Sequence, residues 1–153
     1  QVKEEQLAQI LEAGTYAPTG MGMQSPIMVV VQDAETIAKL SKMNAAVMGV
    51  TSDPFYGAPV ILIVLADKTI PTYKYDGSLV MGNLMNAAES LGLGSIWIHR
   101  AKEEFEMPEF KAVLRDLGIE GEWEGIGHCA VGYIDGDMPK AAARKDGRVF
   151  WAE

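Results

Sequence analysis

The sequence predicts a three-layer α/β/α body, in which helices cover both faces of one central sheet. Segments with helical spacing of apolar residues alternate along the chain with segments of strand spacing, which is the pattern of interleaved helices and strands. The chain has 153 residues, 48% of them hydrophobic and 22% charged, which is enough to bury the core of a single domain. The alternation by itself favours a parallel sheet and leaves mixed or antiparallel pairing open.

The first half of the chain supplies two helices and two strands. Apolar residues at helical spacing predict a helix over 3–13, which would end at Gly14 as its C-cap. The β-branched run at 26–33 predicts a buried strand, and a second periodic segment predicts a helix over 34–47. The run "PVILIVLAD" at 59–67 predicts a strand more strongly than any other segment.

A long helix is predicted over 76–91, with Asp76 as its N-cap. Apolar side chains surround nearly its whole circumference, so a single small subunit would struggle to cover it. We therefore expect a homodimer in which the partner subunit supplies the missing cover. Gly92 follows as the C-cap. The Gly-x-Gly of "LGLGSIW" stands after a helix and before a strand, which is the reverse of the dinucleotide-binding fingerprint.

The second half continues with a strand at 95–100, a helix at 108–117 that begins with Pro108, and a last strand at 126–134. The polar segment 136–153 follows as a C-terminal tail. Three apolar residues near its end are exposed in this arrangement and predict docking on the partner subunit: Val149, Phe150 and Trp151.

The charge balance is acidic. Thirteen Lys and Arg residues stand against 21 Asp and Glu residues, giving a formal net charge of -8, which disfavours nucleic acid and anionic membranes as partners. The longest apolar run, at 58–66, is too short to span a bilayer, and no secretory signal is visible. A single cysteine, Cys129, excludes an internal disulfide and fits a reducing compartment. We expect a cytoplasmic protein.

No side chain stands out as an acid, a base or a nucleophile. His128 and Cys129 are adjacent on a predicted strand, so they face opposite sides, and core packing is the better interpretation of both. The only other histidine is His99, which leaves no metal-ligand spacing. The carboxylates at 102–109 are expected to remain in solution. An enzyme without such groups commonly takes its chemistry from a cofactor.

The segment "ARKDGR" at 143–148 concentrates three cations in this acidic chain. A solvated tail and a site for a phosphate or pyrophosphate group are both compatible with that cluster.

Three stretches, in the same order as in the family, resemble the nitroreductase family of homodimeric FMN enzymes. They are "ILEAGTYAPTGMGMQSPIMVVV" (10–31), "YGAPVILIV" (56–64) and "DGSLVMGNLMNAAESLGLGSIWI" (76–98), of which the last is the most specific. The closing "GHCAVGY" (127–133) and the basic tail fit as well. The resemblance covers essentially the whole chain and implies an α+β fold with a central, largely antiparallel sheet and a tail that reaches onto the partner.

The resemblance also implies where FMN would bind. The loop of Pro18, Thr19, Gly20, Met21 and Gly22 matches the loop beside the flavin held mainly by the other subunit, with Gln24 bracing it. The segment of Trp97, Ile98, His99 and Arg100 matches the one whose main-chain groups address the N5 and O4 edge of the ring. Arg144 and Lys145 match the cationic phosphate ligands. Gly22 stands where the family has Asn, and residues 1–153 contain no match to the family's Arg-x-Ser-x-Arg phosphate segment.

The resulting hypothesis is an FMN-dependent oxidoreductase that passes hydride from NADH or NADPH through flavin N5 to nitroaromatic, quinone or similar electron-poor acceptors. No side chain of the chain is assigned a catalytic role, and no metal is expected. The alternatives are a flavin-binding or flavin-handling protein without efficient NAD(P)H turnover, and a structural dimer without cofactor.

Overall fold

The computed structural model describes residues 1–138 and 140–152, and within them four strands form one sheet. The strands are β1 (Ile27–Val31), β2 (Val60–Asp67), β3 (Gly94–Ile98) and β4 (Trp123–Gly132), in the order β1-β2-β4-β3. All the pairings are antiparallel. The antiparallel sheet implied by the family resemblance is therefore confirmed, and the parallel sheet favoured by the alternation alone is wrong.

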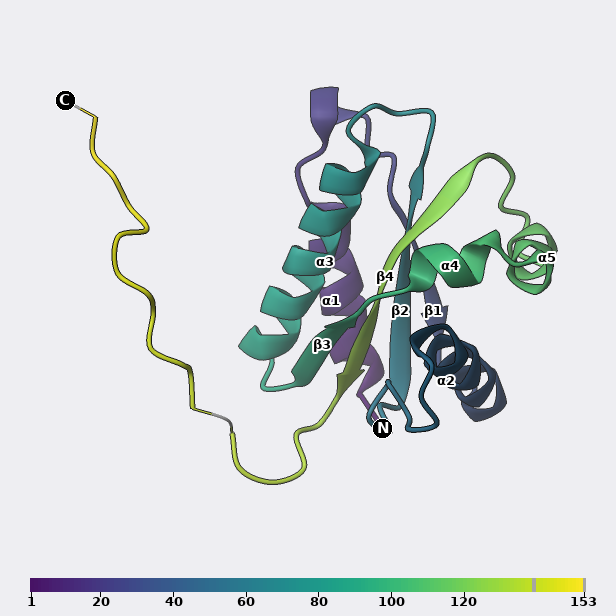
Figure 1. Cartoon of the computed structure of the whole chain (residues 1–153), viewed down its shortest axis with the longest axis horizontal. Helices are drawn as coiled ribbons and strands as arrows, with labels where there is room; N and C mark the ends of the chain where they lie inside the picture. The colour runs from purple at the N-terminus through teal and green to yellow at the C-terminus, as the bar shows by residue number, and fades with distance from the viewer. Residues whose placement is uncertain (139, 153) are drawn as a thin grey trace.

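The sheet is the middle of three layers (Figure 1). One face carries α1 (Glu4–Thr15) and α3 (Tyr73–Ser90), and the other carries α2 (Ala34–Met48), α4 (Ala101–Glu106) and α5 (Pro108–Asp116). Strand β2 serves both cores, because its alternate side chains point to opposite faces and all but its last residue are buried. Val60, Leu62 and Val64 pack toward α1 and α3, and the intervening Ile61, Ile63 and Leu65 pack toward the other helices.

Gly14 has a packing role that differs from the predicted one. Helix α1 continues through Thr15, so Gly14 is not its C-cap. A Cβ atom at Gly14 would lie 2.6 Å from Met28 Sδ and 2.8 Å from Leu84 Cδ2. The missing side chain lets α1 approach β1 and α3 closely, and this close approach explains the glycine.

Helix α3 begins three residues earlier than predicted, at Tyr73, so Asp76 is not an N-cap but lies buried in the first turn. At the other end Gly92 has φ +73°, and the amide of Leu93 bonds back to Ala88 O at 2.9 Å. The predicted glycine stop is confirmed. The sheet and α1 cover most of the apolar circumference of α3, while Tyr75 and Leu79 stay exposed.

The chain after β4 leaves the α/β body as an extended tail (Figure 1). Its apolar residues Val149, Phe150 and Trp151 are 74%, 85% and 88% exposed. Pro139 and Glu153, which belong to the predicted tail segment 136–153, lie outside the described residues. None of the helices in the described ranges has the length and apolar character to cross a membrane.

Candidate functional site

The predicted flavin loop is fastened to α3 by a buried carboxylate. The loop contains a single 3₁₀ turn, η1 (Gly20–Gly22), directly after α1. Asp76 is 2% exposed and accepts hydrogen bonds from the Gly20 amide at 2.9 Å and from Thr72 Oγ1 at 2.8 Å. Its position near the positive end of the α3 dipole suits a negative charge. Asp76 therefore holds the loop against the start of α3.

Gly20 is small for a reason within its own chain. A Cβ atom there would lie 2.9 Å from Thr72 Cγ2 and closer still to Thr72 Oγ1. The smallness of Gly20 thus follows from packing on Thr72, and Gly20→Val would disturb the fold as well as any ligand. The space around Gly22 is open, since a Cβ atom there would meet no heavy atom within 4 Å.

The outer part of the loop is exposed and conformationally strained. Met21 and Gln24 adopt left-handed backbone angles, with φ 53° and 50°, and Met21 is 88% exposed. The Gln24 amide donates to Thr19 Oγ1 at 2.9 Å, so the backbone of Gln24 takes part in bracing the loop. Strained residues of this kind concentrate at ligand sites, provided that surrounding bonds hold them in place.

The second predicted segment lies at the end of an edge strand. β3 pairs only with β4 among the described strands, which leaves its other backbone edge without a strand neighbour. Ile98 is buried in the core beneath α2 and α4, His99 is exposed, and Arg100 has the left-handed φ of 78°. Backbone groups along this edge are available to a ligand that presents both donors and acceptors.

Trp97 is half-buried and packs against the α1/α3 core. Its indole lies where a Cβ atom at Gly127 would be, 2.9 Å from Trp97 Cδ1. In the described residues its buried Nε1 has no hydrogen-bond partner. A buried donor without a partner is costly, and a ligand or a water molecule that accepts from Nε1 would relieve that cost.

The third predicted segment stands apart from the other two. Arg144 and Lys145 lie in the exposed, extended tail, away from the α/β body (Figure 1). In the same view, η1 lies at the N-terminal end of α3 and β3 lies beside its C-terminal half. A single copy of the chain therefore does not gather the predicted residues around one ligand.

A buried polar cluster was missed by sequence reasoning. Glu104 is fully buried, so the expectation that the carboxylates of 102–109 stay in solution is wrong for this residue. Its Oε2 accepts from Asn44 Nδ2 at 3.0 Å and pairs with His128 Nε2. A missed helix, α4, turns Glu104 inward together with Ala101 and Phe105. The apolar residues flanking Glu104 at helical spacing were the available sign of an inward face.

The strand prediction for His128 and Cys129 is confirmed: the two side chains lie in opposite cores. His128 packs between Phe55 and Phe105, and Cys129 lies among the residues beneath α1 and α3. Burial raises the pKa of the Cys129 thiol to about 12. This thiol is a packing group and not a nucleophile at neutral pH. Within the described ranges no group of three or more His, Cys, Asp or Glu side chains could hold a metal ion.

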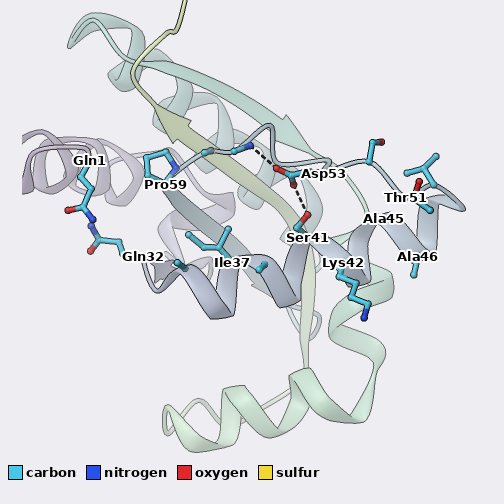
Figure 2. A pocket seen from close by; sticks show the side chains of 16 residues that line it. Gln1, Gln32, Ile37, Ser41, Lys42, Ala45, Ala46, Thr51, Asp53 and Pro59 are labelled. Carbon is cyan, nitrogen blue, oxygen red and sulfur yellow. Dashed lines mark hydrogen bonds between the residues drawn. The ribbon is translucent and has the colours of Figure 1, made fainter.

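A hollow of about 780 Å³ lies over α2 and the segment 50–59 (Figure 2). At its wall Asp53 accepts hydrogen bonds from Ser41 Oγ at 2.5 Å, the Phe55 amide at 2.8 Å and the Gly57 amide at 2.7 Å. Burial alone would raise the pKa of Asp53, but these bonds together hold it below its ordinary value. The carboxylate is thus occupied in shaping its own loop, and the hollow contains none of the predicted site residues.

Residues 1–133 match the sequence model of the nitroreductase family. A curated relative from Archaeoglobus fulgidus, provisionally named NADH dehydrogenase/NAD(P)H nitroreductase, is 32% identical over 124 residues, covering 78% of this chain and 67% of its own length. The FMN reductase [NAD(P)H] of Bacillus subtilis is 27% identical over 147 residues, covering 77% of this chain. The chain spans only 57% of that relative's length.

Among solved structures, a nitroreductase with bound FMN from Bacteroides fragilis superposes with a TM-score of 0.89 at 27% sequence identity. The superposition covers 100% of this chain and 89% of that one. The whole described arrangement of helices, sheet and tail therefore has a counterpart in a chain that was crystallised with FMN.

Proposed function

Because the chain belongs to the nitroreductase family, we propose that it is an FMN-dependent oxidoreductase. It would pass hydride from NADH or NADPH to nitroaromatic, quinone or similar electron-poor acceptors. The observation that carries the proposal is the superposition, over the full chain, on a nitroreductase with bound FMN. The names of the curated relatives, which include an NAD(P)H nitroreductase and an FMN reductase, support the same chemistry.

The chemical groups of the predicted site residues are of the types that would bind FMN. The open backbone edge at the end of β3 offers donors and acceptors to a flavin ring. The exposed loop at Pro18–Gly22 offers a small, apolar surface with the Thr19 hydroxyl. Arg144 and Lys145 offer charge for the phosphate, which a planar guanidinium suits.

A homodimer would gather these groups. We propose a single FMN-binding domain over 1–153, in which the tail 136–153 of one subunit contacts its partner. The exposed Phe150 and Trp151 of the tail, and the exposed Tyr75 and Leu79 of α3, support an interface. Obligate interfaces commonly bury on the order of 2,000 Å² or more.

Bound FMN would supply the hydride chemistry, and the protein groups would position it. The backbone of Trp97–Arg100 would orient the hydrogen-bonding edge of the ring, and the loop held by Asp76 would limit its movement on the other side. The tail cations would hold the phosphate. In this proposal no protein side chain forms a covalent intermediate, and the protons that reduction of the acceptor consumes come from solvent.

Titration of FMN into the purified protein, followed by steady-state oxidation of NADH and NADPH with menadione or a nitroaromatic, tests the proposal. We expect saturable FMN binding and flavin-dependent turnover with at least one acceptor. Tight FMN binding without turnover would favour the alternative, a flavin-binding or flavin-handling protein. Absence of FMN binding by a folded dimer would contradict both and favour the structural dimer.

Mixed dimers test the shared site. A subunit carrying Asp76→Ala would have a released loop, and a subunit carrying Arg144→Ala would lack a phosphate ligand. If each FMN site combines the loop of one subunit with the tail of the other, a mixed dimer of these variants contains one intact site. We expect it to bind FMN more tightly than either parent. Equal, weak binding by mixed and parent dimers would contradict the shared site.

A further inference from the structure

Beneath the turn that joins β3 to α4 lies a polar cluster, the Asn44 cluster, formed by Asn44, Arg100, Glu104 and His128. Its members come from α2, the turn, α4 and β4, and Asn44, Glu104 and His128 are each 0% exposed. Buried polar groups are usually hydrogen-bonded, so the bonds that this cluster makes indicate what it holds. Among the described residues, Glu104 Oε1 and His128 Nδ1 have no partner.

The Asn44 side chain bonds two successive residues of the turn. Its Nδ2 donates to the His99 carbonyl at 2.9 Å, and its Oδ1 accepts from Arg100 Nε at 3.0 Å. Arg100 has φ 78° and ψ 6°, the left-handed conformation that residues with a Cβ atom rarely adopt. One amide from α2 therefore fixes a strained turn that is more than fifty residues distant in the sequence.

The orientation of that amide follows from its partners. The His99 carbonyl can only accept and Arg100 Nε can only donate. Glu104 Oε2 also accepts from Asn44 Nδ2, at 3.0 Å, and pairs with His128 Nε2. The Asn44 NH₂ group must then face Glu104 and His99, and its oxygen must face Arg100. The Glu104 amide also donates to Arg100 O at 3.2 Å. Asn44 and Glu104 thus both bond the turn directly, and His128 bonds Glu104.

Strand β4 is in close contact with the first residue of α4, directly after the turn. A Cβ atom at Gly125 would lie 2.8 Å from Ala101 Cβ and closer to the Ala101 backbone, so α4 starts in direct contact with the strand. The outer side of the turn is open, since His99 is exposed. The cluster therefore fixes the inner side of a strained backbone whose outer side remains free for a ligand.

We propose that Asn44 is a positioning residue that sets the His99–Arg100 backbone for FMN, acting through the turn and not by touching the flavin. The inference rests on the proposed function. Its physical reason is the cost of the left-handed Arg100: without the Asn44 bonds the backbone would relax to an ordinary conformation and move the carbonyl and amide groups at the open end of β3.

The test compares Asn44→Ala with the double variant Asn44→Ala/Arg100→Gly. Glycine adopts the left-handed conformation without strain, so it should restore the turn that Asn44 no longer holds. We expect Asn44→Ala to weaken FMN binding about tenfold or more, as for the loss of a net hydrogen bond in the site, and the double variant to regain most of that affinity. Ser41→Ala is the matched control, since it removes a bond from the same helix on the side of Asp53.

Amide hydrogen exchange of residues 98–101 without FMN supplies a second readout. Asn44→Ala should raise exchange there, and Arg100→Gly should lower it again in the double variant. If Asn44→Ala does not remain folded, Arg100→Ala and Arg100→Gly in the wild-type background replace it. Alanine loses the Asn44 bond and keeps the strain, so it should weaken FMN binding more than glycine does.

Wild-type FMN affinity in Asn44→Ala, or equal losses with alanine and glycine at position 100, would overturn the inference while leaving the proposed function intact. A wild-type protein that binds no FMN would instead overturn the proposed function, and this inference with it.

Discussion

Replacing Asp76 by alanine should release the loop of Pro18–Gly22 from α3, and the structure allows the cost to be worked out. The carboxylate is 2% exposed and accepts bonds from the Gly20 amide at 2.9 Å and from Thr72 Oγ1 at 2.8 Å. Each bond to a charged acceptor contributes about 1.5–3 kcal/mol, and because both donors are partly accessible to water once released, we expect a total loss of about 3 kcal/mol in unfolding free energy.

Two milder variants calibrate this estimate. Asp76→Asn keeps one acceptor oxygen for the Gly20 amide, and Thr72→Val removes a single donor at nearly constant volume, so each should cost about 1 kcal/mol. Urea unfolding followed by circular dichroism gives the three values. FMN titration of the folded variants should show the largest affinity loss in Asp76→Ala, because its loop is the least constrained.

The reasoning would be refuted by an Asp76→Ala variant whose unfolding free energy lies within about 0.5 kcal/mol of wild type, the range typical of surface substitutions. A normal FMN affinity together with the expected destabilisation would support the attachment of the loop to α3 and contradict the assignment of the loop to the flavin site.

Three further predictions concern separate parts of the chain. Arg144→Ala should weaken FMN binding about ten- to a hundredfold, the value of one charge-assisted bond, while Arg115→Ala should not; equal affinities in an equilibrium titration would assign the tail cations to solvent. Cys129 should resist a thiol reagent until the protein unfolds, because burial raises its pKa to about 12. The unfolded thiol ionises from its ordinary pKa of 9.0 upward and the buried one does not, so unfolding free energy should fall as pH rises from 9.0 toward 12, and a Cys129→Ala variant should lack that part of the decline. Hydrogen bonds from Thr36 lower the pKa of Asp33 in the folded protein. The stabilisation of α2 by the Asp33 carboxylate should therefore be present above pH 3.8 and be lost as the pH falls through this lowered pKa. An Asp33→Ala variant whose acid unfolding parallels that of wild type would contradict this prediction.

The sequence predicted the elements better than their pairing. All four strands of the described chain overlap the predicted segments 26–33, 59–67, 95–100 and 126–134, and β4 begins three residues earlier than predicted. Strand direction does not follow from periodicity, since a connection that contains a helix can either cross back to the starting end of the sheet, giving a parallel pair, or stay at one end, giving an antiparallel pair. The antiparallel order came from the family resemblance alone.

Two wrong predictions, for Asp76 and Glu104, share a physical cause, namely hydrogen bonds between residues far apart in the chain. Asp76 resembled an N-cap because it precedes an apolar run, yet its carboxylate bonds Gly20, 56 residues away. Glu104 resembled a solvated acid because its neighbours are charged, yet it pairs with His128, 24 residues away. Local rules describe each residue's own segment and contain no term for the partner that tertiary folding brings to it.

The assignment of FMN contacts remains a prediction. The loop residues Met21 and Gly22, His99 after β3, and the tail are exposed, and these three segments lie apart in one copy of the chain. Whether they meet depends on the association of two copies, which neither composition nor the packing of one subunit determines.

Anaerobic addition of NADH, and separately of NADPH, to the FMN-loaded protein tests the central claim most directly. The visible absorption band of oxidised flavin should disappear with at least one of the two nucleotides and return when menadione is added. A protein that binds FMN tightly, yet whose flavin stays oxidised in the presence of both nucleotides, would contradict the account.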